Sequence, residues 1–153
     1  MCEEFKARLA KAEKALGIPV PVPVYKDEGV LGESHDWAIT VKGINGELSC
    51  HLDGRFSSLQ LAVDGSDKYI DARWNNLSVA VLWAYTQWPQ AKVNRTLAVM
   101  LSAAKHDLKS NRIRGEPNPQ GTGSIDLEPN VTASVYGGEA LRLGLMIDAS
   151  TGK

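Results

Sequence analysis

Each of the three histidines in the sequence has an aspartate one or two positions away, and such pairs can transfer protons or bind metal ions. The pairs are His35 with Asp36, His51 with Asp53, and His106 with Asp107. On a β-strand, His51 and Asp53 would point to the same face. With Thr40 on a neighbouring strand, they form a candidate small-molecule site. A zinc site usually needs three protein ligands and no spacing supplies the third, so we expect neither metal nor cofactor.

Lys and Arg residues gather between positions 92 and 114, where Asp107 is the one acidic residue. The cations are Lys92, Arg95, Lys105, Lys109, Arg112 and Arg114. At about 100° per residue, Lys105, Lys109 and Arg112 share one flank of a helix, with Arg95 not far away. Such a flank can bind a phosphate backbone or an acidic protein surface, or it can be a solvated face that complements the helix dipole. The sequence pI of about 6.3 argues against a dedicated nucleic-acid binder.

Tryptophan side chains are a third group of candidates, because exposed aromatic residues often anchor interfaces. Trp37 and Trp83 have the pattern of core residues. Trp74 and Trp88 are expected at the ends of elements, and either becomes a candidate binding residue if it is exposed.

Two helices are expected within residues 75–112, and they should position the cations. Residues 77–85 form an almost uninterrupted apolar block, which predicts a buried helix. After a break near Trp88 and Pro89, apolar residues recur at helical spacing: Val93, Leu97, Met100, Leu101, Ala104 and Leu108. A further helix is predicted over residues 2–16, with Gly17 as its stop, followed by a stiff Pro/Val tether over residues 18–24.

Alternating apolar residues predict strands in the remaining segments. Residues 37–73 read as a four-stranded meander, with a first hairpin closed at Asn45 and Gly46 that pairs Ile39 with Leu52 and Val41 with Cys50. A bulge is expected near Phe56, and the fourth strand is expected over residues 68–73. Residues 115–130 read as a loop, residues 131–147 as a C-terminal hairpin that turns at Gly137 and Gly138, and residues 148–153 as a frayed tail.

Together these elements predict one α+β domain over residues 1–153. Its antiparallel sheet should have about six strands, with the central helix pair packed on one face and the N-terminal helix beside it. Cys50 is expected to be a buried residue on a strand and Cys2 an exposed thiol, since two distant cysteines form no recognisable pattern. No apolar run reaches the roughly 18 residues of a membrane span, which favours a cytoplasmic protein.

The sequence favours a small non-catalytic interaction protein of the adaptor or inhibitor type, such as phages and mobile elements often carry. It would dock on a protein or nucleoprotein partner or form a homodimer, and the candidate binding residues are Lys105, Lys109, Arg112, Arg114, Arg95, Trp74 and Trp88. One alternative is nucleic-acid binding through the basic helix flank. Another is a small-molecule binder or enzyme that uses Thr40, His51 and Asp53.

Overall fold

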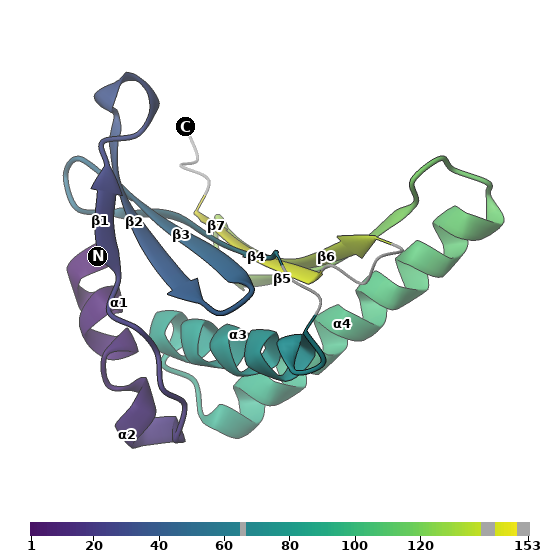
Figure 1. Ribbon diagram of the computed structural model, residues 1–153, viewed down its shortest axis with the longest axis horizontal. Coiled ribbons are helices and arrows are strands. Elements are labelled where there is room, and N and C mark those ends of the chain that lie inside the picture. Colours follow the sequence, from purple (N-terminus) through teal and green to yellow (C-terminus); the bar gives the residue numbers. More distant parts are fainter. Residues whose placement is uncertain (65–66, 139–142, 150–153) are drawn as a thin grey trace.

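The computed structural model describes residues 1–64, 67–138 and 143–149, and in them an antiparallel sheet of seven strands is covered by helices on one face (Figure 1). The strands lie in the order β1-β2-β3-β4-β7-β6-β5. Their bounds are Val24–Asp27 (β1), Ser34–Val41 (β2), Ile44–His51 (β3), Phe56–Val63 (β4), Gln120–Glu128 (β5), Val131–Gly138 (β6) and Leu143–Ala149 (β7). The predicted α+β class with an antiparallel sheet is confirmed, with one strand more than expected.

The helices are α1 (Cys2–Leu9), α2 (Ala12–Leu16), α3 (Ile70–Thr86) and α4 (Gln90–Ile113), and a short 3-10 helix spans Val30–Gly32. The predicted N-terminal helix is therefore interrupted after Leu9, although it ends at Gly17 as expected, in a left-handed conformation. The expected break before α4 is confirmed, because Gln87 is left-handed and Pro89 precedes the first turn of α4. No helix among the described residues is long and apolar enough to cross a membrane.

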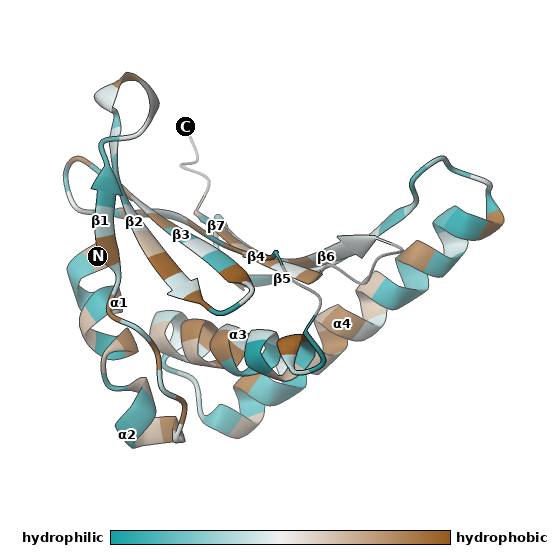
Figure 2. Cartoon of the chain, in the orientation of Figure 1, coloured by the Kyte–Doolittle hydropathy of each residue, from teal (hydrophilic) through white to brown (hydrophobic). Residues whose placement is uncertain are grey.

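The core lies between the sheet and the helix layer formed by α1, α3 and α4. Residues along the middle of α3 are buried on several sides, including Leu77, Val79, Ala80, Val81, Leu82 and Ala84. α4 buries a single stripe, made of Val93, Thr96, Leu97, Met100, Ala104 and Leu108. Figure 2 shows the corresponding contrast between the hydrophobic colouring of α3 and the hydrophilic outer side of α4.

The first hairpin turns three residues earlier than the sequence suggested. Strands β2 and β3 are joined at Lys42 and Gly43, so Ile39 pairs with Gly46 instead of Leu52. Gly46 lies inside β3, where an added Cβ would be 2.7 Å from the Ile39 carbonyl oxygen. The glycine at this position serves close strand packing, and the Asn-Gly pair is not the turn.

Several further segments differ from the prediction. Residues 68–73 contain the start of α3, at Ile70, and not a fourth meander strand. The predicted loop of residues 115–130 contains β5. The predicted bulge near Phe56 is confirmed, because the register between β3 and β4 shifts at this point. The predicted turn at Gly137 and Gly138 is wrong, because both glycines lie in β6. Residues 139–142, predicted as the start of the last strand, lie outside the described residues. Of the predicted tail, residues 148 and 149 belong to β7, and residues 150–153 lie outside the described residues.

The two cysteines also correct the prediction. Cys2 is not an exposed thiol: it is 2% exposed and forms a disulfide with Cys50, at a sequence separation of 48. Phe5 and Leu9 of α1 are buried in the same core. The disulfide therefore fixes the start of α1 to the end of β3.

Candidate interaction site on helix α4

Helix α4, which carries the cations, packs closely on strand β5. Gly121 and Gly123 face α4 from β5, and a Cβ added to either glycine would be closer than 3.0 Å to backbone atoms of the helix. Glycine at both positions lets the helix backbone approach the strand directly. Gly121 and Gly123 lie in the segment that the sequence predicted to be a loop. In the structure they form the contact surface for α4.

Polar contacts fix the C-terminal part of α4 to β5. The Asp107 carboxylate accepts a hydrogen bond of 2.9 Å from the Thr122 backbone amide, and the Asn111 side-chain amide donates to the Gln120 carbonyl. The one carboxylate within the basic run is therefore engaged by the sheet. Its position toward β5 leaves another flank of the helix end to Lys105, Lys109 and Arg112.

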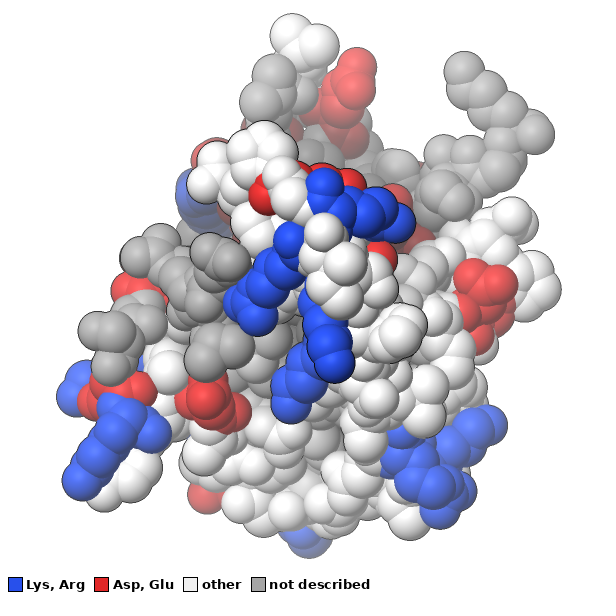
Figure 3. Space-filling model, turned by 90° about the vertical axis from the view of Figure 1, so that its right-hand side faces the viewer, with Lys and Arg blue, Asp and Glu red and all other residues white. Residues whose placement is uncertain are grey.

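Four cations, which we call the basic helix end, lie exposed at the C-terminal part of α4: Lys105, Lys109, Arg112 and Arg114. Arg114 contacts the Asn111 side chain and lies 3.7 Å from a Glu116 carboxylate oxygen. Figure 3 views the molecule from this end and shows Lys and Arg side chains gathered on it. The arrangement can bind a surface that carries several negative charges, with a strength that depends on salt.

The other predicted binding residues lie apart from the basic helix end. Arg95 is exposed on α4, two turns or more before Lys105. Trp88 is half-buried, with the Lys92 ammonium 3.8 Å from its ring centroid. Trp74 is 1% exposed and belongs to the core, so it does not meet the condition of exposure that would make it a binding anchor.

The structure does not assemble the alternative small-molecule site of Thr40, His51 and Asp53. Thr40 pairs with Asn45, whereas His51 pairs with Ser34, six residues away along β2 or about 20 Å. Asp53 lies in the turn after β3 and binds Arg55, with 2.7 Å between carboxylate and guanidinium. The hydrogen bonds from the Arg55 backbone and side chain lower the pKa of Asp53.

Thr40 instead lines a shallow hollow of about 460 Å³ on the sheet face opposite the helices. Its polar lining residues are Lys26, Thr40, Asn45, Glu47 and Gln60, and it includes neither His51 nor Asp53. Lys26 and Glu47 are paired across it at 2.9 Å. The hollow therefore lacks the histidine and aspartate on which the proton-transfer hypothesis depended.

Sequence reasoning missed an acidic surface at the other edge of the sheet, around the connection from β1 to β2. Residues 27–36 contain four acidic residues and neither Lys nor Arg: Asp27, Glu28, Glu33 and Asp36. That local composition was the available signal. Among the described residues, no group of three or more His, Cys, Asp or Glu side chains could hold a metal ion.

Comparison with known protein families, curated proteins and solved structures finds no match for this chain. Its function therefore has to be inferred from its own geometry and charge.

Proposed function

We propose that the protein is a non-catalytic interaction protein that docks on an acidic surface of a protein or nucleoprotein partner through the basic helix end. The observation that carries this proposal is the exposure of four cations within ten residues of a helix whose backbone packs directly on β5. A rigid helix loses little conformational entropy when its side chains bind, which favours recognition over a flexible basic tail.

Binding to a protein is favoured over dedicated nucleic-acid binding by the overall charge of the chain. The formal net charge is −1, with 17 Lys and Arg against 18 Asp and Glu. A dedicated nucleic-acid binder usually has a strongly basic domain, with a pI above about 9. A localised basic end on a nearly neutral protein suits a compact acidic patch better than a long phosphate backbone.

The test is a fluorescence titration of the pure protein with three labelled probes: a polyglutamate peptide, a single-stranded DNA and a duplex DNA. The informative variant is Lys105→Ala/Lys109→Ala. The matched control is Lys11→Ala/Lys14→Ala, which removes the same charge from exposed positions in and beside α2. We expect the first variant to bind polyglutamate at least about tenfold more weakly, and the control to match the wild type.

Two results would contradict the proposal. One is the absence of binding to any probe at low salt, and the other is an equal loss of affinity in both variants. Tight binding to DNA alone, with a log-log salt slope of about 0.9 for each phosphate contacted, would replace the protein partner with nucleic acid.

A further inference from the structure

The exposed edge of the sheet at β1 is a second charged surface, and it also carries exposed apolar side chains. All four β1 residues are exposed. We define the β1 edge surface by three apolar or aromatic residues and three acidic ones, which are Val24, Tyr25, Leu31, Asp27, Glu28 and Glu33. Val24 is 65% exposed and Leu31 is 86% exposed, and each lies within three residues of a carboxylate in the sequence.

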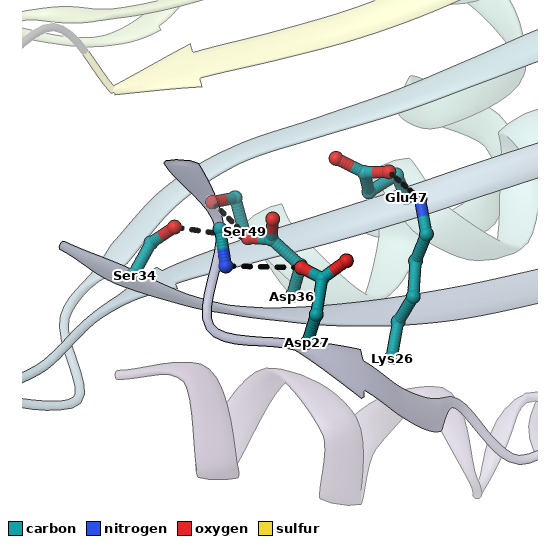
Figure 4. Close-up of polar contacts among 7 residues, drawn as sticks. Lys26, Asp27, Ser34, Asp36, Glu47 and Ser49 are labelled. Carbon is teal, nitrogen blue, oxygen red and sulfur yellow. Dashed lines mark hydrogen bonds and ion pairs between the residues drawn. The ribbon is translucent and has the colours of Figure 1, made fainter. Parts of the chain in front are cut away.

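Local hydrogen bonds hold the carboxylates of Asp27 and Asp36 in place at this edge (Figure 4). The Asp27 carboxylate accepts a hydrogen bond of 2.9 Å from the Gly29 amide, which shapes the loop. Behind the loop, the buried Asp36 carboxylate accepts hydrogen bonds from the Ser34 hydroxyl at 3.1 Å and the Ser49 hydroxyl at 2.7 Å. Two of the four carboxylates of residues 27–36 therefore have defined positions at this edge.

The one cation of β1 does not neutralise this edge. Lys26 donates to Glu47 at 2.9 Å, on the sheet face opposite the helices. The pKa of the Tyr25 hydroxyl is raised, first by partial desolvation and then by the negative charges of Glu28, Asp27 and Asp36. The rise agrees with a net negative field at the exposed strand.

Leu31 is presented to solvent by an uncommon backbone conformation. Its φ of 67° is in the left-handed region, which is unfavourable for a leucine. Such strain often marks residues that serve binding. The basic helix end has a counterpart in Ile113, the last residue of α4, which is 77% exposed. Each charged surface thus carries a largely exposed aliphatic side chain, Leu31 or Ile113, beside several charges of one sign.

One molecule cannot bring its own two surfaces together. β1 and β5 are the opposite edges of the sheet, and α4 lies against β5. Six steps between strands, at about 4.8 Å each, separate the edges by about 29 Å. Figure 1 shows the β1 edge and the C-terminal end of α4 at opposite sides of the molecule.

We propose that the basic helix end of one copy docks on the β1 edge surface of a second copy, with Ile113 and Leu31 as the apolar anchors. This proposal rests on the proposed function and names the acidic partner. The two surfaces have opposite charge, and a net charge of −1 gives little overall repulsion between copies. Docking is through side chains, because Pro19, Pro21 and Pro23 lack the amide donors that would extend strand pairing along this edge.

Because the two surfaces differ, the contact is heterologous, and it either closes into a ring or continues as a chain of copies. The experiment is sedimentation velocity of the full chain at about 0.01 M and about 1 M salt, where the screening length is about 30 Å and about 3 Å. Variant A is Glu28→Lys/Glu33→Lys, and variant B is Lys109→Glu/Arg112→Glu. We expect the wild type to associate at low salt and dissociate at high salt, and each variant alone to associate at least about tenfold more weakly.

Mixing the variants is the decisive step. Variant A changes the formal charge of the three acidic residues of the β1 edge surface from −3 to +1, and variant B changes that of the four cations of the basic helix end from +4 to 0, so neither variant has both surfaces of the contact. In a mixture, the unchanged basic helix end of A can still dock on the unchanged β1 edge surface of B. An equimolar mixture should recover salt-sensitive association, which misfolded variants would not do. A monomeric wild type at low salt, association that persists in either variant, or a mixture that stays monomeric would each overturn the proposal.

The polyglutamate titration separates this proposal from the proposed function. Variant A keeps the basic helix end and should still bind polyglutamate, whereas variant B should not. If the wild type binds polyglutamate but stays monomeric at low salt, self-docking is wrong and docking on an acidic foreign partner stands. If it does neither, both proposals are wrong.

Discussion

Replacement of Gly123 by alanine should destabilise the protein strongly, because the added methyl group would collide with the backbone of α4. Its nearest neighbours would be the Met100 carbonyl oxygen, the Ala103 Cβ and the Ala104 amide nitrogen, all closer than 3.0 Å. Relief requires a movement of α4 away from β5. Overpacking of this kind costs about 1–3 kcal/mol, and the smaller entropy of the unfolded alanine chain offsets about 0.4–1 kcal/mol. Since the colliding atoms belong mainly to backbone, we expect a net loss of at least about 2 kcal/mol.

The measurement is thermal unfolding followed by circular dichroism, with Gly138→Ala on the neighbouring strand as the matched control. A Cβ at Gly138 would be 3.5 Å from its nearest neighbour, the Pro119 carbonyl oxygen, which is an ordinary contact. For a domain of this size, 1 kcal/mol shifts Tm by about 2–4 °C, so Gly123→Ala should lower Tm by at least about 4 °C. Gly138→Ala should leave Tm unchanged or raise it by up to about 4 °C, because the unfolded alanine chain has less entropy. A Gly123→Ala protein within about 1 °C of the wild type would refute the close approach of α4.

Three further predictions concern stability and ionisation. Reduction of the Cys2–Cys50 disulfide should lower the free energy of unfolding by about 4 kcal/mol, given the sequence separation of 48. The measurement is urea unfolding with and without dithiothreitol, and the reductant should not change the stability of a double Cys→Ser variant. The Tyr69 backbone amide lowers the pKa of Asp67, so Asp67→Asn should lower Tm at pH 7, and the difference should vanish as the pH falls through the lowered folded-state pKa. Burial and then the Glu128 carboxylate raise the pKa of Tyr85. An ultraviolet titration of the folded protein should therefore show a last tyrosine that ionises far above the usual range, and Tyr85→Phe should remove this last step. Its ionisation at the ordinary pH of tyrosine would contradict this assignment.

The disulfide also bears on where the protein functions. Disulfides persist in oxidising compartments and are rare in the reducing cytoplasm. If the cytoplasmic location expected from the sequence is correct, Cys2 and Cys50 are thiols there, and the fold relies on Phe5 and Leu9 to hold α1.

Helices α3 and α4 could be predicted because their apolar patterns are long and their boundary contains a proline. The register of the hairpin between β2 and β3 could not be predicted, because sliding a strand by an even number of residues keeps the same side chains on the buried face. Ile39 is inward whether it pairs with Leu52 or Gly46. The sequence does not reveal that Gly46 is needed for close packing, so the usual preference of Asn-Gly for turns led to the wrong turn position.

β5 was missed for a tertiary reason. Its glycines have low strand propensity, and they are explained only by the helix that packs against them. The disulfide has a similar origin, because Cys2 and Cys50 are brought together by the packing of α1 against the sheet. No local pattern indicates either contact.

The basic helix end could be predicted from helical periodicity, because Lys105, Lys109 and Arg112 share a flank in any helix over this segment. The burial of Trp74 could not be predicted, because α3 begins earlier than the sequence suggested and places this residue in the core. The β1 edge surface was overlooked because a short strand beside three prolines has little strand signal.

The separation of the two charged surfaces across the whole width of the sheet gives the molecule a large electric dipole moment. An anionic surface should meet the end with Lys109 and Arg112, and a cationic surface should meet the edge with Glu28 and Glu33. A protein of net charge −1 is then expected to be retained at neutral pH and low salt by both cation-exchange and anion-exchange resins, each resin holding it in the opposite orientation.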